Sequence, residues 1–123
     1  GQTVFLAERC AELIQTDVIT DRTVIDVMAF TLNAKSIPHQ DKEAFETYAS
    51  EFIREYDYIF YISPYGIDIE DNGVRETDEH YRDLIDFTIT TLIKRHGHKA
   101  GKIEKISGST DERIQQILNI TGL

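Results

Sequence analysis

The apolar residues of this chain recur at two different periods, and the alternation of these periods predicts an order of helices and strands. Helical spacing predicts five helices, near residues 3–15, 24–32, 42–55, 81–93 and 109–118. Short apolar runs predict three strands, at residues 18–19, Tyr58–Ile62 and 102–107. The run Tyr58–Ile62 is apolar throughout, which favours a strand buried on both faces. Strands that alternate with helices predict an α/β fold: an open parallel sheet with helices on both faces.

Ligands of open parallel sheets bind beyond the carboxyl ends of the strands. Three segments follow the predicted strands, at residues 20–26, 63–82 and 107–112. Within the second, residues 65–77 form a loop too long for a simple turn, and such loops are often functional. The polar residues of these three segments are therefore the first candidates for chemistry.

The length, composition and net charge of the sequence argue against several classes of protein. The 123 residues suffice for a single domain, and no apolar run reaches the roughly 18 residues that a membrane span needs. No signal peptide is visible and Cys10 is the only cysteine, so we expect a cytoplasmic protein. The net charge of -9 repels phosphate backbones, which argues against non-specific nucleic-acid binding. Clustered arginines can still bind small anions on such a protein.

Asp21 and Arg22 come directly after the first predicted strand, so a parallel sheet would place them at its ligand edge. Asp21 could orient a magnesium-bound water or a substrate hydroxyl, and Arg22 could grip a phosphate or carboxylate. Alternatively, the two form an ion pair with each other, or Asp21 caps the helix behind it. The residues alone leave these alternatives open.

Arg75 lies in the long loop, and Arg82 lies one to two turns into the helix that follows. Two guanidinium groups near one anion could neutralise the charge that develops during phosphoryl transfer. In the alternative, Arg75 pairs with Glu76 or Asp71, and Arg82 pairs with Asp78 or Asp86 at helical spacing.

Glu8 and Arg9 lie in the first predicted helix and could reach into a substrate pocket, although a solvated helix face is the simpler interpretation. Cys10 falls on the apolar stripe of that helix, so we expect it in the core. The four histidines have no cysteine or carboxylate at metal-ligand spacing, and a structural zinc site is not expected.

Four stretches together resemble the P-loop nucleotide-kinase-like ATPases: "VFLAERCAELI", "DVITDRTVIDVMAFT", "YDYIFYISPYGIDIEDNGVRETDEHYRDLI" and "KIEKISGSTDERIQQIL". The resemblance is to the group that includes the kinase domain of the NAD-biosynthesis regulator, and it covers nearly the whole chain. Its most specific pieces are Asp21-Arg22 after a strand, the segment "DNGVR" that ends in Arg75, and the ending "ISGSTDERI".

On the acceptor side, the resemblance implies that Asp21 lies near the magnesium ion and the acceptor, beside an acceptor-binding Arg22. Glu8 and Arg9 match an acceptor-side helix. The implied reaction moves the terminal phosphate of ATP to a nucleoside, nucleotide or similar small hydroxyl acceptor, with ATP and Mg²⁺ as cofactors.

On the phosphate side, Arg75 and Arg82 resemble lid arginines that close on the transferred phosphate. The loop beside the nucleotide base is implied at three residues: Gly108, Ser109 and Thr110. With Asp21, the two arginines make up the implied catalytic set.

The chain departs from this family because it contains no G-x-x-x-x-G-K-[ST], the loop that cradles the phosphates. We therefore expect it to be the C-terminal two-thirds of a single kinase-like domain, with the first strand and the phosphate loop upstream. A missing strand would leave a sheet edge unpaired, which a homodimer could cover. The rival hypothesis is a non-catalytic interaction module of the same descent, which binds a partner through its sheet edge or its acidic surface.

Overall fold

The computed structural model describes residues 2–13, 19–63 and 76–123. Within these ranges the chain forms five α-helices and a two-stranded parallel sheet. The elements are α1 (Gln2–Leu13), α2 (Val24–Leu32), α3 (His39–Ser50), the 3₁₀ helix η1 (Glu51–Glu55), β1 (Tyr58–Ile62), α4 (Glu76–His96), the 3₁₀ helix η3 (Gly97–Lys99), β2 (Lys102–Ile106) and α5 (Thr110–Thr121). The predicted α/β class is confirmed.

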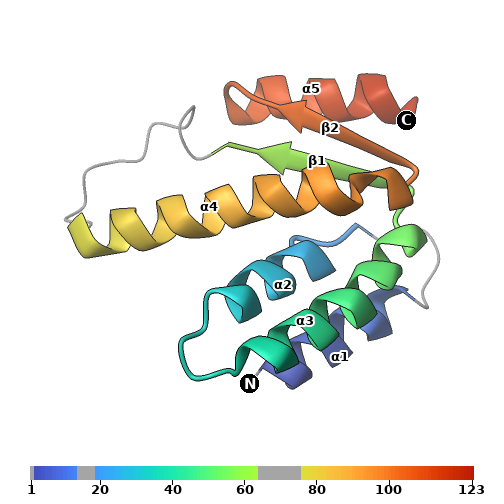
Figure 1. Ribbon diagram of the computed structural model, residues 1–123. Helices are drawn as coiled ribbons and strands as arrows, with labels where there is room; N and C mark the ends of the chain where they lie inside the picture. The colour runs from blue at the N-terminus through green and yellow to red at the C-terminus, as the bar shows by residue number, and fades with distance from the viewer. Residues whose placement is uncertain (1, 14–18, 64–75) are drawn as a thin grey trace.

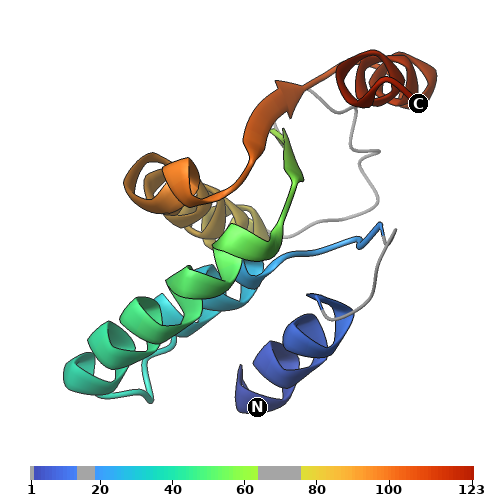
Figure 2. The same cartoon turned by 90° about the vertical axis from the view of Figure 1, so that its right-hand side faces the viewer.

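The sheet lies between α4 on one face and α5 on the other (Figures 1 and 2). β1 and β2 pair in parallel, with Ile59 opposite Ile103 and Ile62 opposite Ile106. Both strands point toward the end of the sheet at which α4 and α5 begin (Figure 1). The carboxyl edge of the sheet is therefore the edge from which these two helices start.

The core is centred on α2, which packs against α1, α3 and α4. Thr23 is its N-cap, and Asp26 completes a capping box, because the Thr23 side chain accepts from the helix backbone while Asp26 accepts from the Thr23 N–H. This cap starts a helix whose apolar residues are nearly all out of solvent, as the predicted period requires. Five of its buried residues are Val24, Ile25, Val27, Met28 and Ala29.

Tyr56 fixes α2 relative to the sheet. Its hydroxyl oxygen accepts a hydrogen bond from the Val24 N–H at 3.2 Å, and its carbonyl oxygen accepts one from the Gly101 N–H at 2.9 Å. A side chain at Gly101 would bring its Cβ to 2.5 Å from the Asp57 carbonyl oxygen. Only glycine fits where the chain turns into β2.

The first predicted strand, at residues 18–19, is wrong at Ile19, the one of its two residues that the structure describes. Ile19 belongs to no strand and is 94 % exposed. A run of two β-branched residues offers too few backbone hydrogen bonds to hold an edge position by itself. Residue 18 lies outside the described residues. Asp21 and Arg22 accordingly enter from the segment that leads into α2, and not from a strand end.

The prediction that Tyr58–Ile62 is buried on both faces is also wrong. Ile59 is buried and joins the core, whereas Tyr58 and Ile62 on the opposite face are 41 % and 39 % exposed. The reason lies in α5, which packs against β2 and covers Ile106 but leaves this face of β1 open. Neither outer edge of the sheet is paired within the described ranges.

Other predicted boundaries hold to within a few residues. α3 begins after Pro38 and ends at Ser50, where the predicted helix continues as η1. α4 begins at Glu76, ahead of the predicted apolar stripe, and ends before Gly97 in a basic last turn. α5 begins with a capping box formed by Ser109 and Glu112. No helix within the described ranges has the length and apolarity needed to cross a membrane.

A partly buried ionic cluster joins α3 to the end of α4. Glu46 accepts hydrogen bonds from Arg95 Nη1 at 2.7 and 2.9 Å, and its Oε2 lies 2.8 Å from His96 Nε2. Burial by itself raises the pKa of Glu46, but the hydrogen bonds and charges of His96 and Arg95 outweigh it and hold that pKa below the ordinary 4.5. The carboxylate is therefore stabilised in its charged form.

Replacing Glu46 by glutamine is expected to lower the free energy of unfolding at pH 7 by about 1–2 kcal/mol, because hydrogen bonds to a charged group are lost. Since the folded pKa lies below the unfolded one, this contribution is complete above about pH 4.5 and disappears as the pH falls through the folded pKa. Urea unfolding of both proteins across this range checks the expectation. The wild type should lose its advantage over Glu46→Gln on acidification.

Glu43 provides the matched control, because it lies on the same helix with a histidine, His39, 3.0 Å away, but both side chains are exposed. Glu43→Gln should change stability by less than about 0.5 kcal/mol at any pH. Equal losses for Glu43→Gln and Glu46→Gln would contradict the role given to the buried cluster.

Candidate ligand-binding site

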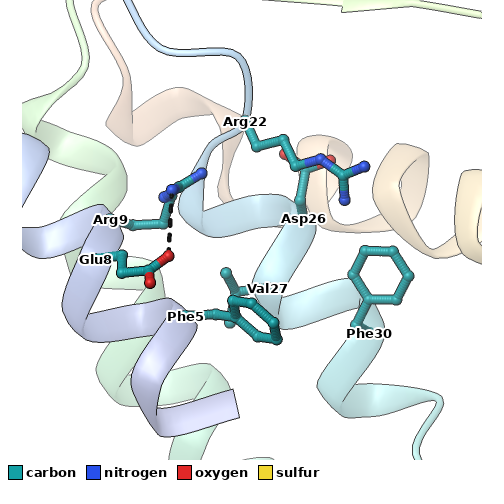
Figure 3. A pocket seen from close by; sticks show the side chains of 7 residues that line it. All are labelled: Phe5, Glu8, Arg9, Arg22, Asp26, Val27 and Phe30. Carbon is teal, nitrogen blue, oxygen red and sulfur yellow. Dashed lines mark ion pairs between the residues drawn. The ribbon is translucent and has the colours of Figure 1, made fainter. Parts of the chain in front are cut away.

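A cavity of about 430 Å³ lies between α1 and the start of α2 (Figure 3). Its volume falls within the roughly 300–1,000 Å³ of small-molecule sites. The lining residues are Phe5, Glu8, Arg9, Arg22, Asp26, Val27 and Phe30. The three residues that the sequence analysis assigned to acceptor binding, Glu8, Arg9 and Arg22, therefore line a single cavity.

The cavity has one apolar side and charged groups around it (Figure 3). We call Phe5, Val27 and Phe30 the apolar wall. Phe5, Glu8 and Arg9 follow one another at helical spacing on α1, as do Asp26, Val27 and Phe30 on α2. The cavity thus results from two helix faces that meet with an aromatic residue on each.

Arg22 lies over the ring of Phe30, with its guanidinium carbon 6.0 Å from the ring centroid. This is a cation–π geometry, which holds the guanidinium plane without using its N–H donors. Within the described ranges, the Arg22 side chain forms no ion pair and no hydrogen bond. A positioned cation with donors available for a planar anion is the most distinctive chemical feature of the cavity.

The two carboxylates of the cavity are engaged elsewhere. Asp26 Oδ2 accepts the Thr23 N–H at 2.8 Å as part of the capping box. Glu8 Oε2 lies 3.7 Å from Arg9 Nη2, in line with a local ion pair, and Arg9 is the more buried of the two. Neither carboxylate is paired with Arg22, so the cavity keeps one cation at the apolar wall.

Asp21 is exposed and does not line the cavity. The alternative in which Asp21 caps α2 is wrong, because Thr23 is the N-cap. Within the described ranges, no three His, Cys, Asp or Glu side chains are grouped as a metal site. Asp21 therefore offers one solvent-accessible carboxylate that belongs to no such group.

Arg82 lies in the first turns of α4, outside the cavity lining. Its Nε is shielded from solvent and has no hydrogen-bond partner in the described part of the chain. Of its two alternative partners, Asp86 is not paired with it, and the side chain of Asp78 lies outside the described residues. Asp86 instead accepts a hydrogen bond from the Tyr61 hydroxyl of β1. The neighbouring Tyr81 lies 6.4 Å from Phe30 between ring centroids, so these turns of α4 adjoin the apolar wall. Arg75 lies outside the described residues.

The loop implied to lie beside the nucleotide base forms the capping turn of α5. Ser109 Oγ accepts the Glu112 N–H at 3.2 Å, and Thr110 Oγ1 accepts from Arg113 at 3.0 Å. Gly108 has φ +100°, and a Cβ there would lie 2.9 Å from Glu112 Oε2, so a side chain would disturb the cap. This turn is at the carboxyl edge of the sheet, separate from the residues that line the cavity.

Cys10 packs against the core, as expected from its place on the apolar stripe. Burial raises the pKa of its thiol, which disfavours the thiolate that a nucleophile needs.

Phe5 and Phe30 were not identified from the sequence, although both lie at helical spacing from charged residues that were. Phe5 precedes Arg9 by one turn and Phe30 follows Asp26 by one turn. One signal could have identified them. On each of the two helices, the aromatic residue lies one turn from a charged residue.

No protein-family model matches this chain, and neither the curated protein sequences nor the solved structures contain a match. The proposal of a function therefore rests on the fold, the cavity and the sequence resemblance.

Proposed function

We propose that this chain is part of a P-loop kinase-type phosphotransferase, which moves the terminal phosphate of ATP to a small hydroxyl acceptor held in the cavity. One observation carries the proposal: Glu8, Arg9 and Arg22, which the sequence resemblance assigns to acceptor binding, line one cavity of suitable size. Catalysis of this kind needs mainly the positioning of the reactants and the stabilisation of charge.

In the proposed reaction, the acceptor oxygen forms a bond to the γ-phosphorus while the bond from that phosphorus to the bridging oxygen breaks and ADP leaves. The hydroxyl proton passes to Asp21 or to solvent. Arg22 orients the acceptor from the cavity. Arg82 and Arg75 are proposed to stabilise the phosphate during transfer, in the role of lid arginines.

The described residues are compatible with the two cofactors. Mg²⁺ in phosphotransferases is held by one or two carboxylates, with water and the substrate phosphates supplying the rest, so the single exposed Asp21 fits this need. Bound magnesium would neutralise phosphate charge. The turn at Gly108–Thr110 lies at the carboxyl edge of the sheet, where nucleotides bind in parallel α/β folds, and could contact the base through its backbone.

The test uses the full-length natural protein, incubated with ATP, Mg²⁺ and a panel of nucleosides and nucleoside monophosphates. Mass spectrometry should find one acceptor heavier by one phosphate group, with an equal amount of ADP. ADP formation without a phosphorylated acceptor, or no ADP at all, would contradict the transferase.

The open face of the sheet favours a second candidate, a non-catalytic interaction module. Tyr58 and Ile62 of β1 are exposed there, and strands of α/β folds normally have both faces covered. A partner or a second copy of the chain would bind this surface. Thermal unfolding separates the candidates: ATP-Mg²⁺ at a hundred times its Kd should add about 2.7 kcal/mol to a kinase and nothing to such a module.

A further inference from the structure

We infer that the molecule bound in this cavity is a planar aromatic ring that carries a phosphate or a carboxylate. The ring lies on the apolar wall of Phe5, Val27 and Phe30, and the anionic group binds the Arg22 guanidinium. This inference rests on the proposed function only in naming the molecule as the acceptor, since the binding itself needs no ATP. It selects charged aromatic acceptors over neutral nucleosides.

The anionic group is inferred from Arg22, an exposed residue whose side chain borders the cavity. Its guanidinium is held over Phe30 by a cation–π contact and has no anionic partner in the described part of the chain. Asp26 does not fill that role, because its Oδ2 accepts the Thr23 N–H and its charge faces the positive end of α2. A ligand anion can therefore take up the Arg22 donors without breaking an existing ion pair.

The ring is required by the apolar wall. Phe30 has two neighbours that position its ring: Arg22 lies over it, and Tyr81 lies 6.4 Å away between ring centroids. Phe5, which is more than half exposed, faces the same cavity from α1. Two aromatic side chains that border a cavity bind a flat ring better than a flexible aliphatic group, because ring faces and edges attract one another.

The charge selection is tested by isothermal titration of the full-length protein in the absence of ATP. The probes are AMP and UMP, the nucleosides adenosine and uridine, ribose 5-phosphate, and benzoate as an aromatic carboxylate. At least one ring anion should bind about 10- to 100-fold more tightly than both nucleosides and ribose 5-phosphate. This factor corresponds to the free energy of a hydrogen bond to a charged group. Tighter binding of a monophosphate or of benzoate identifies the phosphate or the carboxylate as the anionic group.

Two variants locate the binding. Arg22→Gln should abolish the preference for the charged ring over the neutral nucleoside, and Phe30→Leu should weaken every ring ligand but not ribose 5-phosphate. Arg54→Gln is the control, since Arg54 is exposed, pairs with Glu51 and does not line the cavity. Circular dichroism confirms that each variant is folded.

Nucleosides that bind as tightly as every ring anion, or an unchanged preference in Arg22→Gln, would overturn the inference. So would the failure of every ring anion to bind. The proposed function is tested separately, by the phosphorylation assay. Ring anions that bind as expected but are never phosphorylated would support this inference and contradict the transferase.

Discussion

Arg82→Ala is expected to slow phosphate transfer by about a thousandfold in the full-length protein, the lower end of what arginines contribute when they stabilise a transferring phosphate. The Arg82 Nε is out of solvent and lacks a hydrogen-bond partner among the residues described, so this N–H is available to a bound phosphate. The kcat should carry most of the loss, because the interaction is needed mainly in the transition state. Steady-state kinetics with varied ATP and varied acceptor measure the split.

The control for this prediction is Arg54→Ala, which removes an exposed arginine that pairs with Glu51 at helical spacing. Its kcat and KM should match those of the wild type. If Arg82→Ala instead raised the KM for ATP with kcat unchanged, Arg82 would contribute ground-state binding and the lid role would be wrong.

Leu92→Ala is expected to lower the free energy of unfolding by about 2–5 kcal/mol, a large part of the stability of a domain of this size. Leu92 is completely buried in α4 and belongs to the core that joins this helix to α2 and the sheet. The loss combines the transfer of the leucine side chain with the cavity that remains. Chemical denaturation followed by circular dichroism gives the value.

Leu84 is the matched control, because it lies two turns earlier on the same helix and is 42 % exposed. Leu84→Ala should cost less than about 1 kcal/mol. Comparable losses at the two positions would mean that α4 does not bury the face that the structure assigns to the core.

The helices could be predicted from the sequence because their information is local. Thr23 and Asp26 form a capping box within four residues, and the apolar period of α2 continues directly from it. The stripe of α4 and the basic turn before Gly97 identify that helix in the same way. Periodicity and capping act within a few turns of the chain, so one sequence is enough to read them.

The two errors concern non-local packing. The composition of Tyr58–Ile62 is the same whether one face or both are covered, and the outcome depends on α5 lying over β2 rather than β1. At Ile19, the β-branched composition indicated a strand, but a strand needs a neighbour with which to pair. The spacing of nearby residues shows neither which strand α5 covers nor whether Ile19 has a neighbouring strand.

The candidate site was predictable in part. Glu8, Arg9 and Arg22 could be proposed from the resemblance, whereas the apolar wall depends on the way in which α1 meets α2. The side chains of Phe5 and Phe30 face one cavity only after the two helices are packed. Helical spacing identifies which residues share a face, but it does not give the packing angle between two helices.

The most direct test of the account is the effect of Arg22→Gln on the two substrates of the full-length protein. If the cavity holds the acceptor, kcat/KM for the acceptor should fall by about 10- to 100-fold, the worth of a charge-assisted hydrogen bond, while the KM for ATP stays unchanged. Arg54→Gln should change neither value. An unchanged kcat/KM for the acceptor in Arg22→Gln, or a loss confined to ATP, would contradict the assignment of this cavity as the acceptor site.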